Sequence, residues 1–351
     1  MKWFRAHARA LPWREITGSG MRDAYRSLVS EFMLQQTQVS RVIEKFAPFI
    51  ERFPNIEALA NADEKSVLGA WSGLGYYRRA RLLHAAAKQI VSEHGGRVPS
   101  QAAILRDITG IGAYTAGAIS SIVFAQREPL ADGNVARVTL RLDAVKDASP
   151  SQPAVMKRVW TRAAELIETP TGSKHPGVLN EALMELGATV CTPKAPSCAT
   201  CPVASDCASR RTGLQHVIPL AKSALKKKPI VMLSVVVADS RGRMLMEQRG
   251  EKGMWAGLWQ SPTFESATPF STSVEDELLA KAREALGLSM RLSVIERFAH
   301  ATTHREVTVI VAKAVTRVSK LGEREWFDSE AIAELGISNA QRRVMEIALG
   351  S

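Results

Sequence analysis

The first 190 residues of this 351-residue chain contain no cysteine, and all four cysteines lie between Cys191 and Cys207. Disulfides that stabilise a secreted fold would not crowd into one short loop. The chain also has no apolar run long enough to cross a membrane, and residues 1–5 lack the apolar core of a signal peptide. We therefore expect a cytoplasmic protein, and the clustered cysteines indicate a metal centre.

Acidic residues are scarce relative to basic ones. The chain has 35 Asp and Glu against 46 Lys and Arg, which gives a net charge of +11 and an isoelectric point near 9.7. This excess suits a polyanionic partner, because Lys and Arg release counterions from a phosphate backbone. An acidic membrane surface is the competing interpretation of the charge.

The pattern of apolar residues divides the chain into two parts. Residues 1–215 read as mostly helical, with apolar residues at helical spacing in 25–32, 42–53, 80–91 and 155–167. Residues 216–228 are poor in apolar residues, end in a run of lysines and indicate a linker.

The remaining residues, 229–351, predict an α+β domain. Strands are expected at 230–238, 243–248 and 305–315, and helices at 274–285 and 339–349. The expected fold class is therefore a multi-domain protein, with an all-α domain followed by an α+β domain.

The cysteine spacing is Cys191, six residues, Cys198, two residues, Cys201, five residues, Cys207. Four thiolates can hold a 4Fe–4S cluster, or a tetrahedral zinc ion as the alternative. Zinc sites usually contain two short Cys-x-x-Cys pairs, whereas the outer gaps here are longer and unequal. The loop resembles the cluster loop of the endonuclease III superfamily of DNA glycosylases. That resemblance implies one 4Fe–4S cluster, mainly structural, which braces a basic loop against DNA.

A second motif lies upstream, in residues 108–117, where Gly110 and Gly112 permit a tight turn and close backbone approach to a ligand. Asp132 follows eighteen residues after Tyr114. Alone, the segment around Asp132 would indicate only a turn. Together with the cysteine loop, these segments resemble the helix-hairpin-helix and the catalytic aspartate of the same superfamily. The resemblance implies a six-helix module of about residues 22–129 and a cluster module of residues 1–21 plus 130–215.

Tyr114 occupies the position that distinguishes the two reaction types of the superfamily. Members that also cut the strand carry a lysine there, which attacks the sugar as an amine. A phenol, with an ordinary pKa of about 10, cannot form a Schiff base. We therefore predict a monofunctional glycosylase.

Four segments resemble the MutY-type adenine DNA glycosylases more specifically: residues 11–14, 30–39, 73–77 and 180–187. Adenine leaves only when a ring nitrogen is protonated, so the reaction needs an un-ionised general acid and an ionised carboxylate beside the sugar. The resemblance assigns protonation of N7 to Glu31 and stabilisation or trapping of the sugar cation to Asp132. It assigns orientation of the aspartate and water to Tyr114 and Asn134.

The resemblance also implies that seven residues contact adenine or DNA: Trp13, Arg14, Leu34, Gln36, Val39, Tyr76 and Glu181. The apolar residues among them could instead be part of the core, and Arg14 and Glu181 could instead form a surface ion pair. The segment 15–22 looks a few residues longer than is usual in the family.

The C-terminal part resembles the Nudix-like domain of the same family, most clearly in residues 254–260. Residues 283–288 lack the paired glutamates that hold Mg²⁺ in a Nudix hydrolase. In the family this domain reads 8-oxoguanine with a loop that usually has the sequence Phe-Ser-His. The matching positions here are Thr302, Thr303 and His304, so a hydroxyl and the histidine remain but the aromatic residue is absent.

These observations predict an adenine DNA glycosylase of base excision repair. It would act as a monomer on double-stranded DNA with A:8-oxoguanine or A:G mispairs, without a membrane partner, and would associate with the nucleoid in a bacterium. One alternative is a bifunctional pyrimidine-lesion glycosylase and lyase. Others are a non-enzymatic DNA-damage binder that carries the cluster and, least favoured, a Nudix hydrolase.

Overall fold

The computed structural model describes residues 1–16, 21–221, 227–288, 292–315 and 322–350. By internal contacts the chain forms two compact units. The first contains Met1–Asn61 and Leu82–Ser223, and the second contains Ala62–Arg81 and Ala224–Ser351. Part of the expected linker, residues 222–226, lies outside the described residues. None of the described helices is long and apolar enough to cross a membrane.

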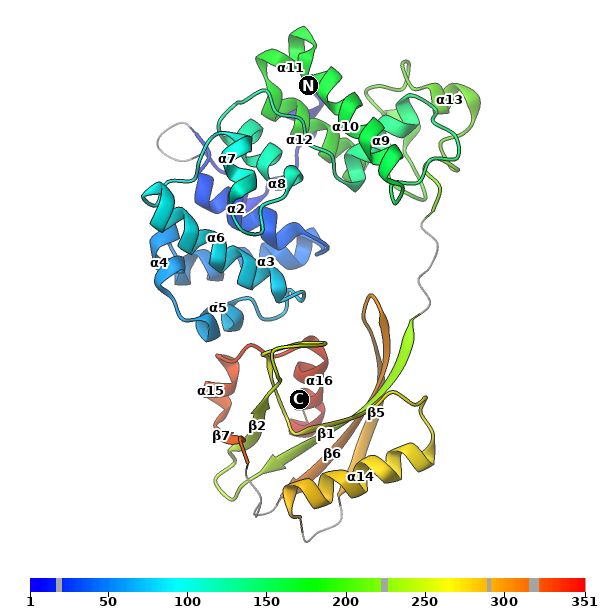
Figure 1. Ribbon diagram of the computed structural model, residues 1–351. Helices are drawn as coiled ribbons and strands as arrows, with labels where there is room; N and C mark the ends of the chain where they lie inside the picture. The colour runs from blue at the N-terminus through cyan, green and yellow to red at the C-terminus, as the bar shows by residue number, and fades with distance from the viewer. Residues whose placement is uncertain (17–20, 222–226, 289–291, 316–321, 351) are drawn as a thin grey trace. The chain divides into compact units, whose positions relative to one another are not determined.

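The first unit is helical, as the sequence predicts (Figure 1). The four helical stretches expected from periodicity are confirmed, and shorter helices join them. The helices are α1 (Lys2–His7), α2 (Ala24–Leu34), α3 (Val39–Arg52), α4 (Ile56–Asn61), α6 (Arg78–His94), α7 (Ala102–Asp107), α8 (Ala113–Ala118), α9 (Gly133–Leu142), α10 (Pro153–Glu168), α11 (Pro170–Lys174), α12 (Pro176–Thr189) and α13 (Ala208–Thr212).

Helix α2 runs through the core of this unit. It begins at Asp23, whose side chain accepts a hydrogen bond from the backbone N–H of Arg26 at 2.8 Å. Such a cap satisfies one of the free N–H groups of the first turn. Eight of its eleven residues, from Tyr25 to Met33, are buried, so almost every face of the helix meets protein. Any polar side chain in its middle is therefore removed from water.

Helices α9 and α12 pack closely beside the hairpin that precedes them. The contact depends on small residues: a Cβ at Gly187 would lie 2.6 Å from the Cβ of Asn134, and one at Gly177 would lie 2.4 Å from the carbonyl oxygen of Ser121. An alanine at either position would therefore force backbone movement. The contact at Gly187 thus fixes the start of α9 against the last turn of α12, and the contact at Gly177 fixes the start of α12 against Ser121.

The second unit contains a mixed sheet in the order β3-β2-β1-β6-β5, with β4 paired to β1 and β7 paired to β2. The strands are β1 (Lys228–Ala238), β2 (Met244–Gln248), β3 (Trp259–Gln260), β4 (Thr263–Ser266), β5 (Ser293–Ala301), β6 (Arg305–Val315) and β7 (Glu325–Phe327). The expected strands are β1, β2 and β6, and they are confirmed; β1 and β6 pair in parallel over eleven residues.

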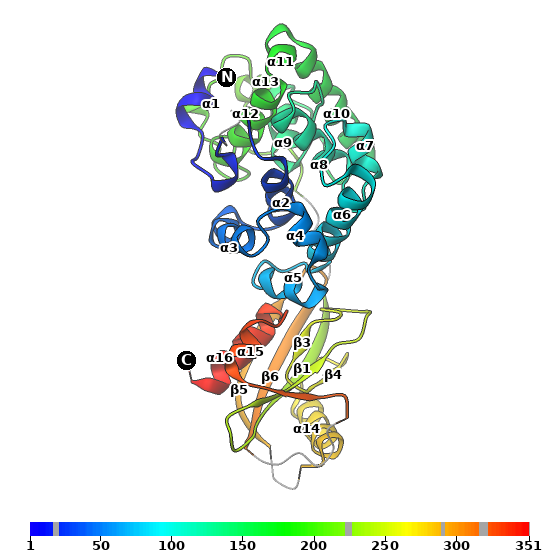
Figure 2. The ribbon, with the colours of Figure 1, turned by 90° about the vertical axis from the view of Figure 1, so that its left-hand side faces the viewer.

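Helix α14 (Thr272–Leu286) packs against one face of the sheet, and α16 (Asn339–Leu349) packs against the other (Figure 2). Both helices were expected from the sequence. The unit also contains α15 (Ser329–Ala333) and the segment Ala62–Arg81, which includes α5 (Glu64–Ala70). The α+β character of the C-terminal part is therefore confirmed.

Candidate active site

A cavity of about 510 Å³ opens in the first unit. Ten of the residues singled out in the sequence line it, although they come from segments up to 168 positions apart. They are Trp13, Arg14, Glu31, Leu34, Gln36, Val39, Tyr114, Asp132, Asn134 and Glu181. The fold thus brings together the side chains that the sequence motifs suggested.

Glu31 lies on α2 and is 9% exposed. Its Oε2 atom is buried and has no hydrogen-bond partner among the described residues. Burial raises the pKa of Glu31 from 4.5 to about 7. The nearby Tyr114 hydroxyl opposes this rise, whereas the charges of Asp132 and Glu181 add to it. Glu31 can therefore keep a proton near neutral pH, as a general acid must.

Tyr114 lies on α8 beside Glu31. Its hydroxyl donates a hydrogen bond to Sδ of Met184 at 3.3 Å. Burial raises the pKa of Tyr114 well above 10, and the neighbouring carboxylates of Glu31 and Asp132 raise it further. The side chain is therefore a neutral phenol that can donate a hydrogen bond.

Asp132 caps the N-terminus of α9. Its Oδ1 accepts hydrogen bonds from the backbone N–H groups of Asn134 at 2.9 Å and Val135 at 2.7 Å, and its Oδ2 accepts one from Nδ2 of Asn134 at 2.8 Å. A helix N-terminus favours a negative charge at this position. The turn expected from the sequence thus also holds the Asp132 carboxylate in a fixed orientation at the wall of the cavity.

Arg137 connects the start of α9, next to Asp132, to the cysteine loop. Its Nη2 donates to Oδ1 of Asn134 at 2.7 Å and to the carbonyl of Gly187 at 2.9 Å, and its Nε donates to the carbonyl of Cys191 at 2.7 Å. Arg137 therefore links the Asn134 side chain, which bonds Asp132, to the backbone carbonyl of Cys191, the first cysteine of the loop.

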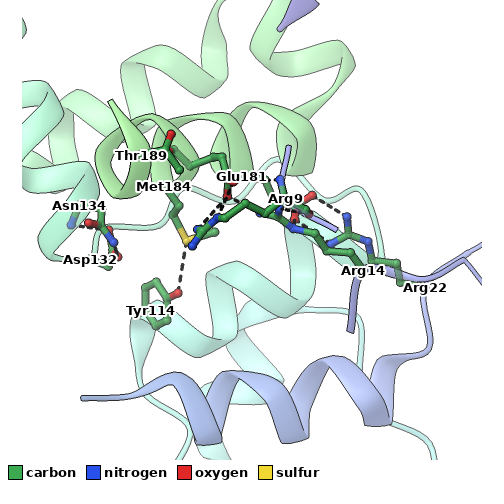
Figure 3. A network of polar contacts seen from close by, with 10 residues as sticks. Arg9, Arg14, Arg22, Tyr114, Asp132, Asn134, Glu181, Met184 and Thr189 are labelled. Carbon is green, nitrogen blue, oxygen red and sulfur yellow. Dashed lines mark hydrogen bonds and ion pairs between the residues drawn. The ribbon is translucent and has the colours of Figure 1, made fainter. Parts of the chain in front are cut away.

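Three arginines from the N-terminal segment form ion pairs with two glutamates of α12, Glu181 and Glu185. In Figure 3 these arginines, Arg9, Arg14 and Arg22, lie across the Tyr114–Met184 contact from Asp132. Arg14 binds both Glu181 and Glu185, each at 3.0 Å. Arg14 and Glu181 thus form an ion pair with each other, but a buried one, with side chains 14% and 7% exposed. Arg9, Arg22 and Glu185 also line the cavity and were not singled out in the sequence. The four-residue spacing of the two glutamates, which puts both on one helix face, was the available signal.

The apolar wall contains Trp13, which is 8% exposed and packs edge-on against Phe46 with ring centroids 5.5 Å apart. Trp13, Leu34 and Val39 therefore serve partly as core, while each also lines the cavity. Gln36 is exposed and has a φ of 56°, which is costly for a residue other than glycine. Backbone strain of this kind is concentrated at functional sites.

The two glycines of the hairpin play different parts. Gly110 has a φ of 82°, and a Cβ there would lie 2.7 Å from the Cβ of Leu82, so conformation and packing both require glycine. Gly112 is exposed, and a Cβ there would meet no atom within 4 Å. Gly112 leaves the backbone open to close approach.

Tyr76, Thr302, Thr303 and His304 lie in the second unit and do not line the 510 Å³ cavity. Tyr76 is 48% exposed with a φ of 49°, and its hydroxyl lies 2.9 Å from Oγ1 of Thr303. Thr303 and His304 are exposed, and Thr302 is half-buried, in the turn between β5 and β6. Strand β5 was not predicted, so the sequence did not show that this loop is a hairpin tip.

All four cysteines line a second, smaller cavity in the first unit. Burial raises the pKa of Cys201, and the charges of Cys191, Cys198 and Cys207 raise it further, so four thiolates gathered here would need a cationic group. Among the described residues, no three His, Cys, Asp or Glu side chains form a ready-made site for a single metal ion.

One hydrogen-bond donor faces the same cavity. The guanidinium of Arg141, a residue 2% exposed, donates to Sγ of Cys191 at 3.3 Å. Four cysteines with an arginine beside them fit an anionic thiolate-ligated cluster.

Comparison with known proteins gives matches across the chain. Residues 29–165 match the model of the HhH-GPD superfamily of base excision DNA repair proteins, and residues 233–346 match that of the NUDIX domain. The human adenine DNA glycosylase is 33% identical over 405 residues, which covers 100% of this chain and 73% of the human protein. The adenine DNA glycosylase of Mycolicibacterium smegmatis is 43% identical over 213 residues, covering 61% of this chain and 69% of that protein.

Among solved structures, a thermostable thymine-DNA glycosylase has a TM-score of 0.52 at 23% identity, covering 60% of this chain and 93% of that one. At this identity the likeness concerns the fold alone.

Proposed function

This chain belongs to the adenine DNA glycosylases of base excision repair, and on that basis we propose that it removes adenine paired with 8-oxoguanine or guanine in double-stranded DNA. The observation that supports the chemistry is a buried Glu31 in the same cavity as Asp132, with a pKa of about 7 and an oxygen, Oε2, that has no hydrogen-bond partner in the described part of the chain. The site of action would be the cytoplasm.

In the proposed mechanism adenine is flipped out of the duplex into the cavity, between Trp13, Leu34 and Val39. Glu31 donates its proton to N7, which turns adenine into a neutral leaving group. The C–N bond breaks, and its electron pair goes to the base. The sugar becomes an oxocarbenium ion, which the carboxylate of Asp132 stabilises or traps covalently. Water then adds to C1′ of the sugar, displacing Asp132 where that has bonded, and gives a proton back to the Glu31 carboxylate. Asn134 holds Asp132 and would orient that water.

Tyr114 supports a monofunctional reaction. Its phenol stays neutral and has no amine with which to form a Schiff base. We expect adenine release to leave the strand intact until the abasic product is heated in alkali. The measurement is denaturing electrophoresis of an end-labelled duplex with and without the alkaline step. Strand cleavage as fast as base release, without alkali, would support the bifunctional alternative instead.

The four cysteines would hold one 4Fe–4S cluster, and Arg141 and Arg137 would bond to the loop around it. When bound, such a cluster supplies a rigid brace for the loop and redox capacity. We expect protein purified without oxygen to contain about four iron atoms per chain, and Cys198→Ser to lower this content. One zinc ion per chain with no iron, measured by atomic emission, would establish the zinc alternative.

The second unit would read the base opposite the adenine. Thr302, Thr303 and His304 form an exposed or half-buried turn whose hydroxyls and imidazole are groups that hydrogen-bond a base edge. Residues 283–288, at the end of α14, lack the glutamate pair of a Nudix hydrolase. We therefore propose recognition, not hydrolysis, for this unit.

A further inference from the structure

The arginines around Glu181 and Glu185 occupy different numbers of hydrogen-bond acceptor positions on the two carboxylates. An ionised carboxylate has about four lone-pair positions for hydrogen-bond donors. Counting the donors on each oxygen therefore shows what a carboxylate can still accept. The inference below rests on the proposed function, because it concerns how the same cavity recognises adenine.

Glu185 has no acceptor position left. Its Oε1 accepts from the backbone N–H of Arg9 at 3.0 Å and from Nε of Arg9 at 2.7 Å. Its Oε2 accepts from Nη2 of Arg9 at 3.0 Å and from Nη2 of Arg14 at 3.0 Å. The side chain is 1% exposed, and these bonds lower its pKa despite the burial. Glu185 is therefore a structural anchor for Arg9 and Arg14.

Glu181 has one position left. Its Oε1 accepts from Nε of Arg14 at 3.0 Å and from Nη1 of Arg22 at 2.9 Å, while its Oε2 accepts from Nη2 of Arg22 at 2.8 Å. No other donor to Glu181 is present among the described residues. Within that part of the chain, one lone pair of Oε2 therefore stays open in the cavity that also contains Glu31.

Arg22 reaches Glu181 from the segment that departs from the family pattern. Ile16 and Arg22 form an isolated antiparallel bridge, which places Arg22 next to the segment that contains Arg14. The Arg22 side chain is 19% exposed and grips both oxygens of Glu181 with two parallel hydrogen bonds. Such a fork fixes the plane of a carboxylate, which a single bond cannot do.

We propose that Arg22 is a positioning residue for substrate specificity: it orients Glu181 so that the open lone pair of Oε2 accepts an N–H from the exocyclic amine of adenine. That amine lies on the same edge of the base as N7, the atom that Glu31 protonates. A 6-oxo purine places an acceptor there, opposite a carboxylate oxygen, and is rejected. The site thus reads a 6-aminopurine through one oriented acceptor.

Arg22 has a second effect that can be measured separately. Its positive charge lowers the pKa of Glu31, against burial and the charges of Asp132 and Glu181, which raise it, while the Tyr114 hydroxyl also lowers it. Loss of the Arg22 charge should therefore move the alkaline limit of activity to higher pH. Lysine at position 22 would keep the charge but lose the fork, so the two effects can be separated.

The test compares Arg22→Gln and Arg22→Lys with the wild-type chain. Single-turnover rates are measured on duplexes that carry either adenine or unsubstituted purine, which lacks the amine, opposite 8-oxoguanine. We expect Arg22→Gln to lower the adenine rate about tenfold or more relative to the purine rate, and to move the alkaline limit upward. Arg22→Lys should show the lowered ratio with a wild-type alkaline limit.

The matched control is Arg162→Gln, since Arg162 on α10 also binds two carboxylates, at 3.3 Å and 2.9 Å, but outside the cavity. It should behave as wild type. An unchanged adenine-to-purine ratio in both Arg22 variants would overturn the positioning role. Absence of adenine release by the wild-type chain would instead contradict the proposed function itself.

Discussion

Replacing Glu31 by glutamine should lower the single-turnover rate of adenine release by about a thousandfold, and it should make the folded protein more stable in alkali. The first effect follows because glutamine has no proton to give to N7. The second follows because the buried carboxyl of Glu31 has a pKa of about 7, against 4.5 when it is free. Activity and stability should thus change in opposite directions.

The pH dependence has a definite sign. Below pH 4.5 the Glu31 carboxyl is protonated in both the folded and the unfolded chain, so its ionisation costs no stability. As the pH rises toward 7, the unfolded chain ionises first, and the folded state loses relative stability. Above pH 7 the loss reaches about 3 kcal/mol. Glu31→Gln should therefore unfold at higher denaturant concentration than wild type at pH 9, and the two should converge near pH 4.

The control is Glu44→Gln, which removes an exposed carboxylate paired with Arg41 on the surface of α3. This variant should keep its rate and should show no gain in stability at pH 9. Duplex binding by Glu31→Gln, measured by fluorescence anisotropy, should remain close to wild type. Adenine turnover that survives in Glu31→Gln would show that another group supplies the proton.

Asp132→Asn should lower adenine release by about a hundredfold or more, with only a small drop in melting temperature. Asparagine caps a helix about as well as aspartate and keeps an oxygen for the N–H groups of Asn134 and Val135, and it loses only the bond from Nδ2 of Asn134. It carries no charge with which to stabilise the sugar cation. The substitution therefore separates the chemistry of Asp132 from its structural part in starting α9.

The matched control is Asp328→Asn, which changes the capping aspartate of α15 in the second unit. It should leave the rate unchanged. Asp132→Ala is a useful third variant, since it should lose activity and also about 1 kcal/mol of stability with the cap. If Asp132→Asn kept the wild-type rate at the same melting temperature, the carboxylate would have no part in the reaction.

Much of the site was predictable because its residues lie in short, distinctive segments. The motif that singles out Glu31 sits on a helix that is buried on nearly all sides, and this burial removes the Glu31 carboxyl from water. The cysteine spacing likewise indicated one site, and all four cysteines line one cavity. The C-terminal domain was assigned from β1, β2 and β6, and the apolar runs of β1 and β6 are long.

Other features depend on contacts between distant segments, which periodicity does not encode. The donor count on Glu181 needs Arg14 and Arg22, about 160 positions away in sequence, and no local pattern marks Arg22. Strand β5 was missed because its burial is mostly low, so its apolar alternation is weak. The strained backbone of Gln36 is likewise visible only in the structure.

The central claim is that a buried Glu31 and Asp132, the N-cap of α9, together remove adenine opposite 8-oxoguanine. The most direct test is the single-turnover rate of adenine release from duplexes with A:8-oxoguanine, A:G and A:T pairs, measured from pH 5 to 9. The account predicts release from the two mispairs, little from A:T, and a rate that falls above about pH 7, the pKa of Glu31. A rate that is equal for A:T, or that rises with pH through this range, would contradict it.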